Sequence, residues 1–156
     1  MKKQIQYKRI WAMPNHSTFS ILPIKQFIEK HTIPGKHLDP FPHPFQQDAL
    51  KLMKTIPANS ISLGFYDPIY SRRQQDEIYK IKDKGEGKNY QSHPKYFSQI
   101  EKEWFRIIKP KGRVLKFMRN SKSMSGFEVI DGILVPHGGQ HNDTICTAFE
   151  KTQETL

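Results

Sequence analysis

The strongest constraint on the fold is a long amphipathic helix pattern that lies between two strand patterns. The segment HPKYFSQIEKEWFRIIKP carries apolar side chains at spacings of three and four residues, which places them on one helix face. This stripe, which we interpret as core, comprises Tyr96, Phe97, Ile100, Trp104, Ile107 and Ile108. SISLGFY before it and RVLKFM after it are typical of strands, and Ile61, Leu63 and Phe65 alternate in the first. This order of elements favours an α/β sheet of mostly parallel strands.

The remaining patterns fit the same sheet. ILPIKQFIEKH predicts a short helix with Pro23 in its first turn, where proline is tolerated, and with Ile24 and Phe27 on one face. QQDALKLMKTI predicts a second short helix, and Pro110 is expected to end the long one. FEVIDGILVP and TICTAFE, separated by HGGQHND, predict an antiparallel C-terminal hairpin. We therefore expect a single domain over residues 1–156.

Composition argues against several classes of protein. No stretch is long and apolar enough to span a bilayer, the segment MKKQIQYKRI lacks the apolar run of a signal peptide, and Cys146 is the only cysteine. We therefore expect a cytoplasmic protein with no membrane partner. The formal net charge is +10, and seven basic residues with no acidic one lie between Trp104 and Phe127. This surplus favours an anionic partner, nucleic acid first, and solubility alone is the other interpretation.

The stretch FYDPIY ends a strand pattern on a carboxylate, a proline and an aromatic side chain. Ligands of open α/β sheets bind beyond the carboxyl ends of the strands, so this loop is a candidate site as well as a candidate turn. The exocyclic amine of a nucleobase is a poor nucleophile because its lone pair is delocalised into the ring. Asp67 and the backbone carbonyl of Pro68 are suited to accept the amine hydrogens, and Tyr70 is suited to stack on the base. Such a base would be flipped out of a duplex, and Arg72 and Arg73 follow the turn to hold its phosphates.

Several segments, in order, resemble the amino-methylating DNA methyltransferases, especially a compact set of bacterial and phage adenine-specific enzymes. FYDPIY resembles the catalytic Asp-Pro-Pro-Tyr motif, HLDPFP resembles the turn at the donor, and WAMPNHSTFSILPIKQFIEKH resembles the amino-terminal donor segment. IEKEWFRIIKPKGRVLKF and GFEVIDGILVPHGGQHNDTICTAFEK are similar to a later helix and strand and to the C-terminal hairpin. The resemblance implies a mostly parallel Rossmann-like methyltransferase sheet, reduced in size. It also implies S-adenosylmethionine as the donor and methylation of an adenine amino group in DNA, as in restriction-modification.

The resemblance also assigns residues to the two halves of the site. Its catalytic positions are Asp67, Pro68 and Tyr70. Its cofactor-binding positions are Phe19, Ser20, Pro23, Asp39, Pro40, Phe41 and Asp48. For Asp48 two roles stay open: an acceptor for the ribose of the donor, or a residue beside its adenine ring. From their charge, the residues expected at nucleic-acid phosphates are Arg72, Arg73, Lys116, Arg119 and Lys122, with a solvated face as the alternative.

Two features depart from the family pattern. Ile69 stands where a second proline is usual, and the chain runs from Pro40 to Asp48 where relatives carry a small-residue loop, a strand and an acidic residue. The short segment keeps a second interpretation open: a catalytically degenerate relative that binds DNA or pairs with a second subunit or a homodimer mate. RNA methylation is a third, because the same chemistry serves adenine in RNA. We interpret His137 and His141 as turn residues rather than metal ligands.

Overall fold

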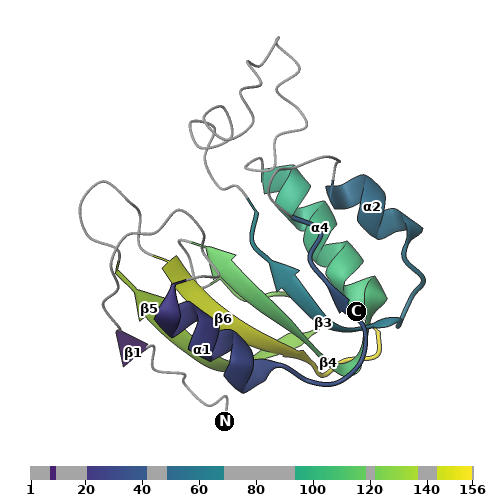
Figure 1. Ribbon diagram of the computed structural model, residues 1–156. Helices are drawn as coiled ribbons and strands as arrows, with labels where there is room; N and C mark the ends of the chain where they lie inside the picture. The colour runs from purple at the N-terminus through teal and green to yellow at the C-terminus, as the bar shows by residue number, and fades with distance from the viewer. Residues whose placement is uncertain are drawn as a thin grey trace.

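A mixed sheet with helices on both faces organises the structure, a computed structural model that describes residues 8–9, 21–41, 49–68, 94–118, 122–136 and 144–155 (Figure 1). The strands are β1 Lys8–Arg9, β2 His37–Leu38, β3 Ile61–Tyr66, β4 Ile108–Met118, β5 Phe127–Val135 and β6 Thr144–Lys151. The helices are α1 Leu22–His31, α2 Ala49–Thr55 and α4 Pro94–Ile107. Within these residues the sheet has the strand order β1-β5-β6-β4-β3-β2.

The sheet divides into a parallel part and an antiparallel part. Adjacent strands β2, β3 and β4 run parallel to one another, and β1 runs parallel to β5 at the opposite edge. Strand β6 is antiparallel to both β4 and β5. The predicted α/β class and C-terminal hairpin are therefore confirmed. The pairing of β1 with β5 was not predicted, because a two-residue strand leaves no periodic pattern.

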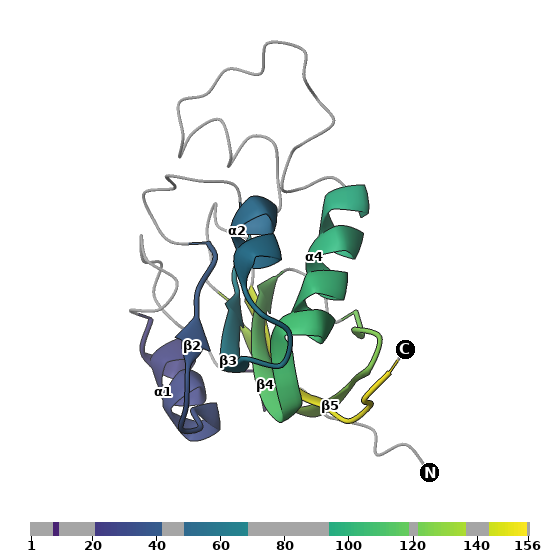
Figure 2. The ribbon, with the colours of Figure 1, turned by 90° about the vertical axis from the view of Figure 1, so that its right-hand side faces the viewer.

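The helices cover the sheet in two layers. Figures 1 and 2 show α1 on one face and α2 with α4 on the other, so the sheet separates two cores. The core under α1 includes Ile24, Phe27, Leu63, Phe117 and Cys146. The core under α2 and α4 includes Met53, Tyr66, Trp104, Val114 and Phe149. None of the helices in the described ranges has the length and apolar character needed to cross a bilayer.

Helix α4 follows the predicted apolar stripe. Tyr96, Ile100, Trp104 and Ile107 are buried and Phe97 is half-buried, which confirms the core interpretation. A long amphipathic helix between two parallel strands is the usual way to join neighbouring strands of such a sheet. Here α4 joins β3 to β4.

The end of α4 lies earlier than predicted. The helix ends at Ile107, before Pro110, because its last carbonyls find partners in a neighbouring segment. The backbone N–H of Ser60 donates to the carbonyl of Ile107 at 2.8 Å. The next residue, Ile108, already pairs with Ile61 of β3. The pairing of Ile108 with β3 therefore ends the helix two residues before the residue that precedes Pro110.

Strand β3 is buried on both faces, and this corrects the predicted alternation of Ile61, Leu63 and Phe65. Ile61 lies in the core under α4, whereas Leu63 and Phe65 pack in the core under α1. The backbone N–H groups of Ser62 and Leu63 both donate to the carbonyl of Lys36, as at a β-bulge in β3, and such a bulge changes the face on which the following side chains lie. Gly64 then faces α4, where an added Cβ would lie 2.3 Å from Cζ3 of Trp104. The glycine lets the helix pack closely on the strand.

Candidate active site at the carboxyl edge of the parallel strands

Two Asp-Pro turns lie side by side at one edge of the sheet. Strand β2 ends at Leu38, and Asp39-Pro40 follows it. Strand β3 ends at Tyr66, and Asp67-Pro68 follows it. Leu38 pairs with Gly64 in parallel register, so both turns leave the carboxyl edge of the sheet. Ligands of open α/β sheets bind at this edge.

The first turn is held in place by its own aspartate. The backbone N–H of Phe41 donates to Asp39 Oδ1 at 2.9 Å, which closes a short turn of the kind that aspartate favours. Phe41 is buried, and its ring centroid lies 5.8 Å from that of Tyr66. Pro40 is buried as well. The turn after β2 is thus packed onto the last residue of β3.

The second turn directs its carboxylate toward the α1 side. Successive side chains of a strand point to opposite faces, and Tyr66 belongs to the core under α4, so Asp67 follows on the α1 side. Asp67 is half-buried and Pro68 is buried. Burial raises the pKa of the Cys146 thiol, and the charge of Asp67 raises this pKa further. This electrostatic effect agrees with the placement, because Cys146 lies in the core under α1.

Helix α1 begins beside the same edge. Figure 1 shows its first turn toward the ends of the parallel strands and its last turn toward their beginnings. Pro23 lies in the first turn, as predicted, and is half-buried. Ile21 and Ile24 are buried in the core that also holds Phe117 and Cys146. The amino-terminal end of α1 and the carboxylate of Asp67 therefore share one side of the sheet.

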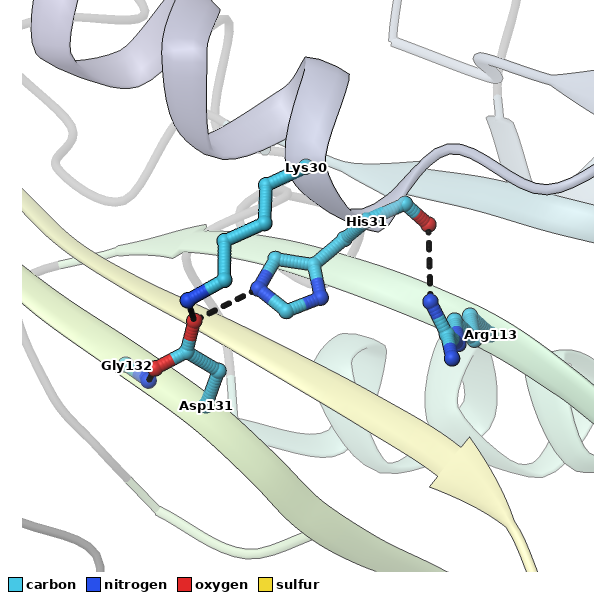
Figure 3. Close-up of polar contacts among 5 residues, drawn as sticks. All are labelled: Lys30, His31, Arg113, Asp131 and Gly132. Atoms are coloured by element: carbon cyan, nitrogen blue, oxygen red, sulfur yellow. Dashed lines mark hydrogen bonds and ion pairs between the residues drawn. The ribbon is translucent and has the colours of Figure 1, made fainter.

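The other end of α1 is fastened to the sheet by charged groups (Figure 3). Lys30 Nζ and His31 Nε2 both donate to Asp131 Oδ2 on β5, at 2.9 and 2.6 Å. The backbone N–H of Gly132 donates to Asp131 Oδ1 at 2.9 Å. Arg113 on β4 donates to the carbonyl of His31 at 3.3 Å. One carboxylate thus accepts three hydrogen bonds and ties the last turn of α1 to β5.

Burial and hydrogen bonding set the charges in this cluster. Burial lowers the pKa of His31, and the hydrogen bond and charge of Asp131 offset this only in part. Burial alone would raise the pKa of Asp131, but hydrogen bonds from Lys30, His31 and Gly132 outweigh it and lower the pKa below its usual value. At neutral pH the contact therefore joins a neutral imidazole N–H to a carboxylate.

Lys116 does not lie at the surface, where a phosphate contact was expected. It is 3% exposed, and its Nζ donates to the carbonyl of Lys122 at 3.0 Å. The amine lies 5.9 Å from the ring centroid of Tyr66 and 5.8 Å from that of Phe149. Burial lowers the pKa of Lys116, and the charge of Glu101 on α4 offsets this in part. The expectation of a direct phosphate contact is corrected because β4 is an interior strand and this side chain points beneath α4.

The remaining expected residues are divided between the surface and the undescribed part of the chain. Lys122 is exposed. The expected site residues outside the described ranges are Phe19, Ser20, Asp48, Tyr70, Arg72, Arg73 and Arg119, together with Ile69, His137 and His141. Among the described residues, no three His, Cys, Asp or Glu side chains gather as a metal site requires.

Sequence reasoning missed the anchoring of α1 by His31 and Asp131. The signal for His31 was present: Ile24, Phe27 and His31 are spaced by three and four residues, so the histidine lies on the buried face. Asp131 had no such signal. Its partner is a hundred residues away in the chain, and only the sheet order brings β5 under α1.

Comparisons with known proteins give a distant likeness to solved structures and no match elsewhere. No family model matches the chain, and no curated protein matches it. Among solved structures, the chain is similar to a protein from Thermus thermophilus that is proposed to be a DNA modification methylase, at 14% identity and a TM-score of 0.43. The match covers 80% of this chain and 56% of that one. The chain thus spans little more than half the length of that protein.

Proposed function

We propose that this chain is an S-adenosylmethionine-dependent methyltransferase that acts on the exocyclic amino group of adenine in DNA. The observation that carries the proposal is the pair of Asp-Pro turns at the carboxyl edge of adjacent parallel strands. One turn, Asp39-Pro40, belongs to the proposed donor side, and the other, Asp67-Pro68, belongs to the proposed catalytic side. The contact between Phe41 and Tyr66 joins them.

On the catalytic side, this chain supplies two hydrogen-bond acceptors and an aromatic ring. The carboxylate of Asp67 and the carbonyl of Pro68 would accept the two hydrogens of the adenine amine. The nitrogen would then become pyramidal and its lone pair would be free to attack the methyl group. Tyr70 would stack on the flipped base. When bound, S-adenosylmethionine supplies an activated methyl group.

On the donor side, the proposal uses the turn after β2 and the start of α1. Phe41 is already held against Tyr66, and the hydrogen bond to Asp39 fixes its backbone. Pro23 would add a rigid surface from the first turn of α1. Phe19, Ser20 and Asp48 complete the proposed donor site from their positions in the sequence.

The choice of DNA rests on charge. The net charge of +10 favours an anionic partner, and Lys122 places an exposed amine on the segment between β4 and β5. Arg72, Arg73 and Arg119 would hold further phosphates.

The test combines donor binding with one substitution. Isothermal titration of the protein with S-adenosylmethionine should give saturable one-to-one binding, and methyl transfer to duplex DNA should follow. Asp67→Ala should abolish transfer while leaving DNA affinity close to that of the unchanged protein. Glu128→Ala, which removes an exposed carboxylate from β5, is the matched control and should transfer normally. Full transfer by Asp67→Ala would refute the catalytic assignment.

A second candidate function is a catalytically inactive subunit that binds DNA and pairs with a partner or with its own copy. The observation that favours it is the short connection from Phe41 to α2, which starts at Ala49, where the resemblance leads us to expect a longer donor-binding segment. This candidate predicts DNA binding without donor binding. Light scattering at several protein concentrations, with and without duplex DNA, would show whether the chain self-associates.

A further inference from the structure

The burial of Lys116 is costly for the fold and points to a purpose other than stability. Removing an ammonium from water costs several kcal/mol unless its partners compensate. At 3% exposure, a methionine of similar length would fill this position without that cost. The question is therefore what the buried amine holds.

The other buried lysine in the described sheet shows what a fully compensated amine looks like. Lys151 Nζ donates to Phe105 O at 2.6 Å, Ile108 O at 2.8 Å and Asn59 Oδ1 at 3.2 Å. Three oxygens thus match the three donors of an ammonium, and two of them are backbone carbonyls, one in the last turn of α4 and one at the first residue of β4. This lysine joins α4, β4 and β6 at the edge of the sheet opposite the Asp-Pro turns.

The partners of Lys116 are different. Within the described residues it has one hydrogen-bond acceptor, the carbonyl of Lys122, together with two aromatic faces and the through-space charge of Glu101. Its amine therefore holds a single point of backbone, and that point lies on the segment that leaves β4 at the carboxyl edge. Lys116 is also the register partner of Tyr66, the residue before Asp67.

The same segment has a second anchor two residues later. The side chain of Met124 is buried in the core under α4, and its carbonyl accepts from Phe127 N at 3.2 Å. Backbone held at Lys122 and at Met124 has little freedom to move away from the sheet. The side chain of Lys122, by contrast, is exposed. A fixed backbone sets where the exposed side chain of Lys122 begins, and thereby the region that its amine can reach.

We propose that Lys116 is a positioning residue for DNA binding: its buried amine fixes the backbone at Lys122, so that the exposed amine of Lys122 meets a phosphate beside the Asp67 turn. This inference rests on the DNA partner of the proposed function. It replaces the direct phosphate contact that the sequence predicted for Lys116. Lys116 acts only through Lys122, and this indirect role separates it from a residue that merely supports the fold.

The test is a double-mutant cycle read by fluorescence anisotropy with a labelled DNA duplex over a range of salt concentrations. Lys122→Ala should weaken binding about tenfold near 0.1 M salt and reduce the salt slope by about one, as expected for one lost phosphate contact. Lys116→Met should weaken binding similarly although it removes no exposed charge. The double variant should bind like Lys122→Ala alone, because the two residues act in series.

Two controls separate positioning from folding. Lys151→Met removes a buried lysine far from the turns, and should lower stability while leaving the DNA affinity of the folded protein unchanged. Lys116→Gln, which keeps a donor on a shorter side chain, repeats the cycle if Lys116→Met fails to fold. Circular dichroism establishes folding for each variant.

The outcomes are distinguishable. Unchanged affinity in Lys116→Met, or losses that multiply in the double variant, would overturn the positioning role and leave the proposed function intact. An unchanged protein that binds no duplex even at low salt would overturn the DNA partner and this inference together. The positioning role of Lys116 would be established if the double variant lost no more DNA affinity than Lys122→Ala alone and if Lys151→Met bound DNA normally.

Discussion

The ring of Phe41 lies against the ring of Tyr66, with 5.8 Å between centroids and an angle of 32° between planes. Phe41 closes the first Asp-Pro turn, and Tyr66 precedes the second. The two turns are therefore parts of one packed unit, and a displacement of one turn would displace the other. In the proposed function, this contact joins the donor side to the catalytic side.

The first prediction concerns this contact. Phe41→Leu keeps an apolar side chain but loses the ring, and we expect it to cost about 1 kcal/mol of unfolding free energy, whereas Phe41→Ala should cost about 3–5 kcal/mol. Urea unfolding measures both. Phe41→Leu should also lower the affinity for S-adenosylmethionine, measured by isothermal titration. Phe105→Leu, at the far edge of the sheet, should leave this affinity unchanged. Equal donor affinity in both leucine variants would contradict the place of Phe41 in the donor site.

A second prediction concerns the close packing of α4 on β3. Gly64→Ala would place a methyl group 2.3 Å from Cζ3 of Trp104, and we expect the overpacking to lower the unfolding free energy by about 1–3 kcal/mol. In a Trp104→Phe background the same change should cost less, because the smaller ring leaves room for the methyl group. The exposed control Ser123→Ala should change stability by less than about 0.5 kcal/mol. Additive effects of the two substitutions would show that the backbone, and not the indole, sets the cost.

A third prediction concerns the pH dependence of stability. The pKa of His31 is lowered from its ordinary value of 6.5, mainly by burial, so the unfolded chain takes up this proton before the folded chain does. Stability from this group is present above about pH 6.5 and is lost as the pH falls from there through the folded pKa, with a slope of at most about 1.4 kcal/mol per pH unit. Asp131 also has a lowered pKa, so the unfolded chain protonates this carboxylate first, and a further loss of stability follows as the pH falls below about 3.8.

Urea unfolding at pH 7.5, 6.5 and 5.5 measures the first of these losses. His31→Gln keeps a hydrogen-bond donor near Asp131 but cannot titrate, so it should lose less stability than the unchanged protein over this range. Parallel pH dependences in the two proteins would show that His31 titrates alike in the folded and unfolded states.

The sequence predicted the elements of this fold better than their connections. The stripe of α4 and the hairpin of β5 and β6 were readable because side-chain spacing reports the face that an element buries. Two features could not be predicted from the sequence: the end of α4 at Ile107, and the burial of Ile61 on the opposite face of the sheet from Leu63. Both depend on pairing with a distant segment, and spacing within one element carries no information about that partner.

The candidate site was predicted in a similar way. Asp67 was found because an aspartate before a proline at the end of a strand pattern is a local signal. Asp39 was assigned by the family resemblance of HLDPFP, and the structure brings the two turns together. Lys116 was misplaced because charge alone does not tell which face of an interior strand a residue occupies. Asp131 was missed because its importance comes from α1, which crosses β5 only in the folded molecule.

The order β1-β5-β6-β4 has a consequence for synthesis of the protein on the ribosome. Strand β5 emerges before β6, yet in the described sheet it reaches β4 only through β6. Lys8 and Arg9 are synthesised before β5, and they cannot pair until Ile133 and Leu134 of β5 have been added to the sheet. The nascent chain can assemble β2, β3 and β4 early, but the described strands β5 and β1 stay unattached to them until β6 leaves the exit tunnel. A chain that is cut short within β6 would therefore lose β5 and β1 from the sheet together with β6.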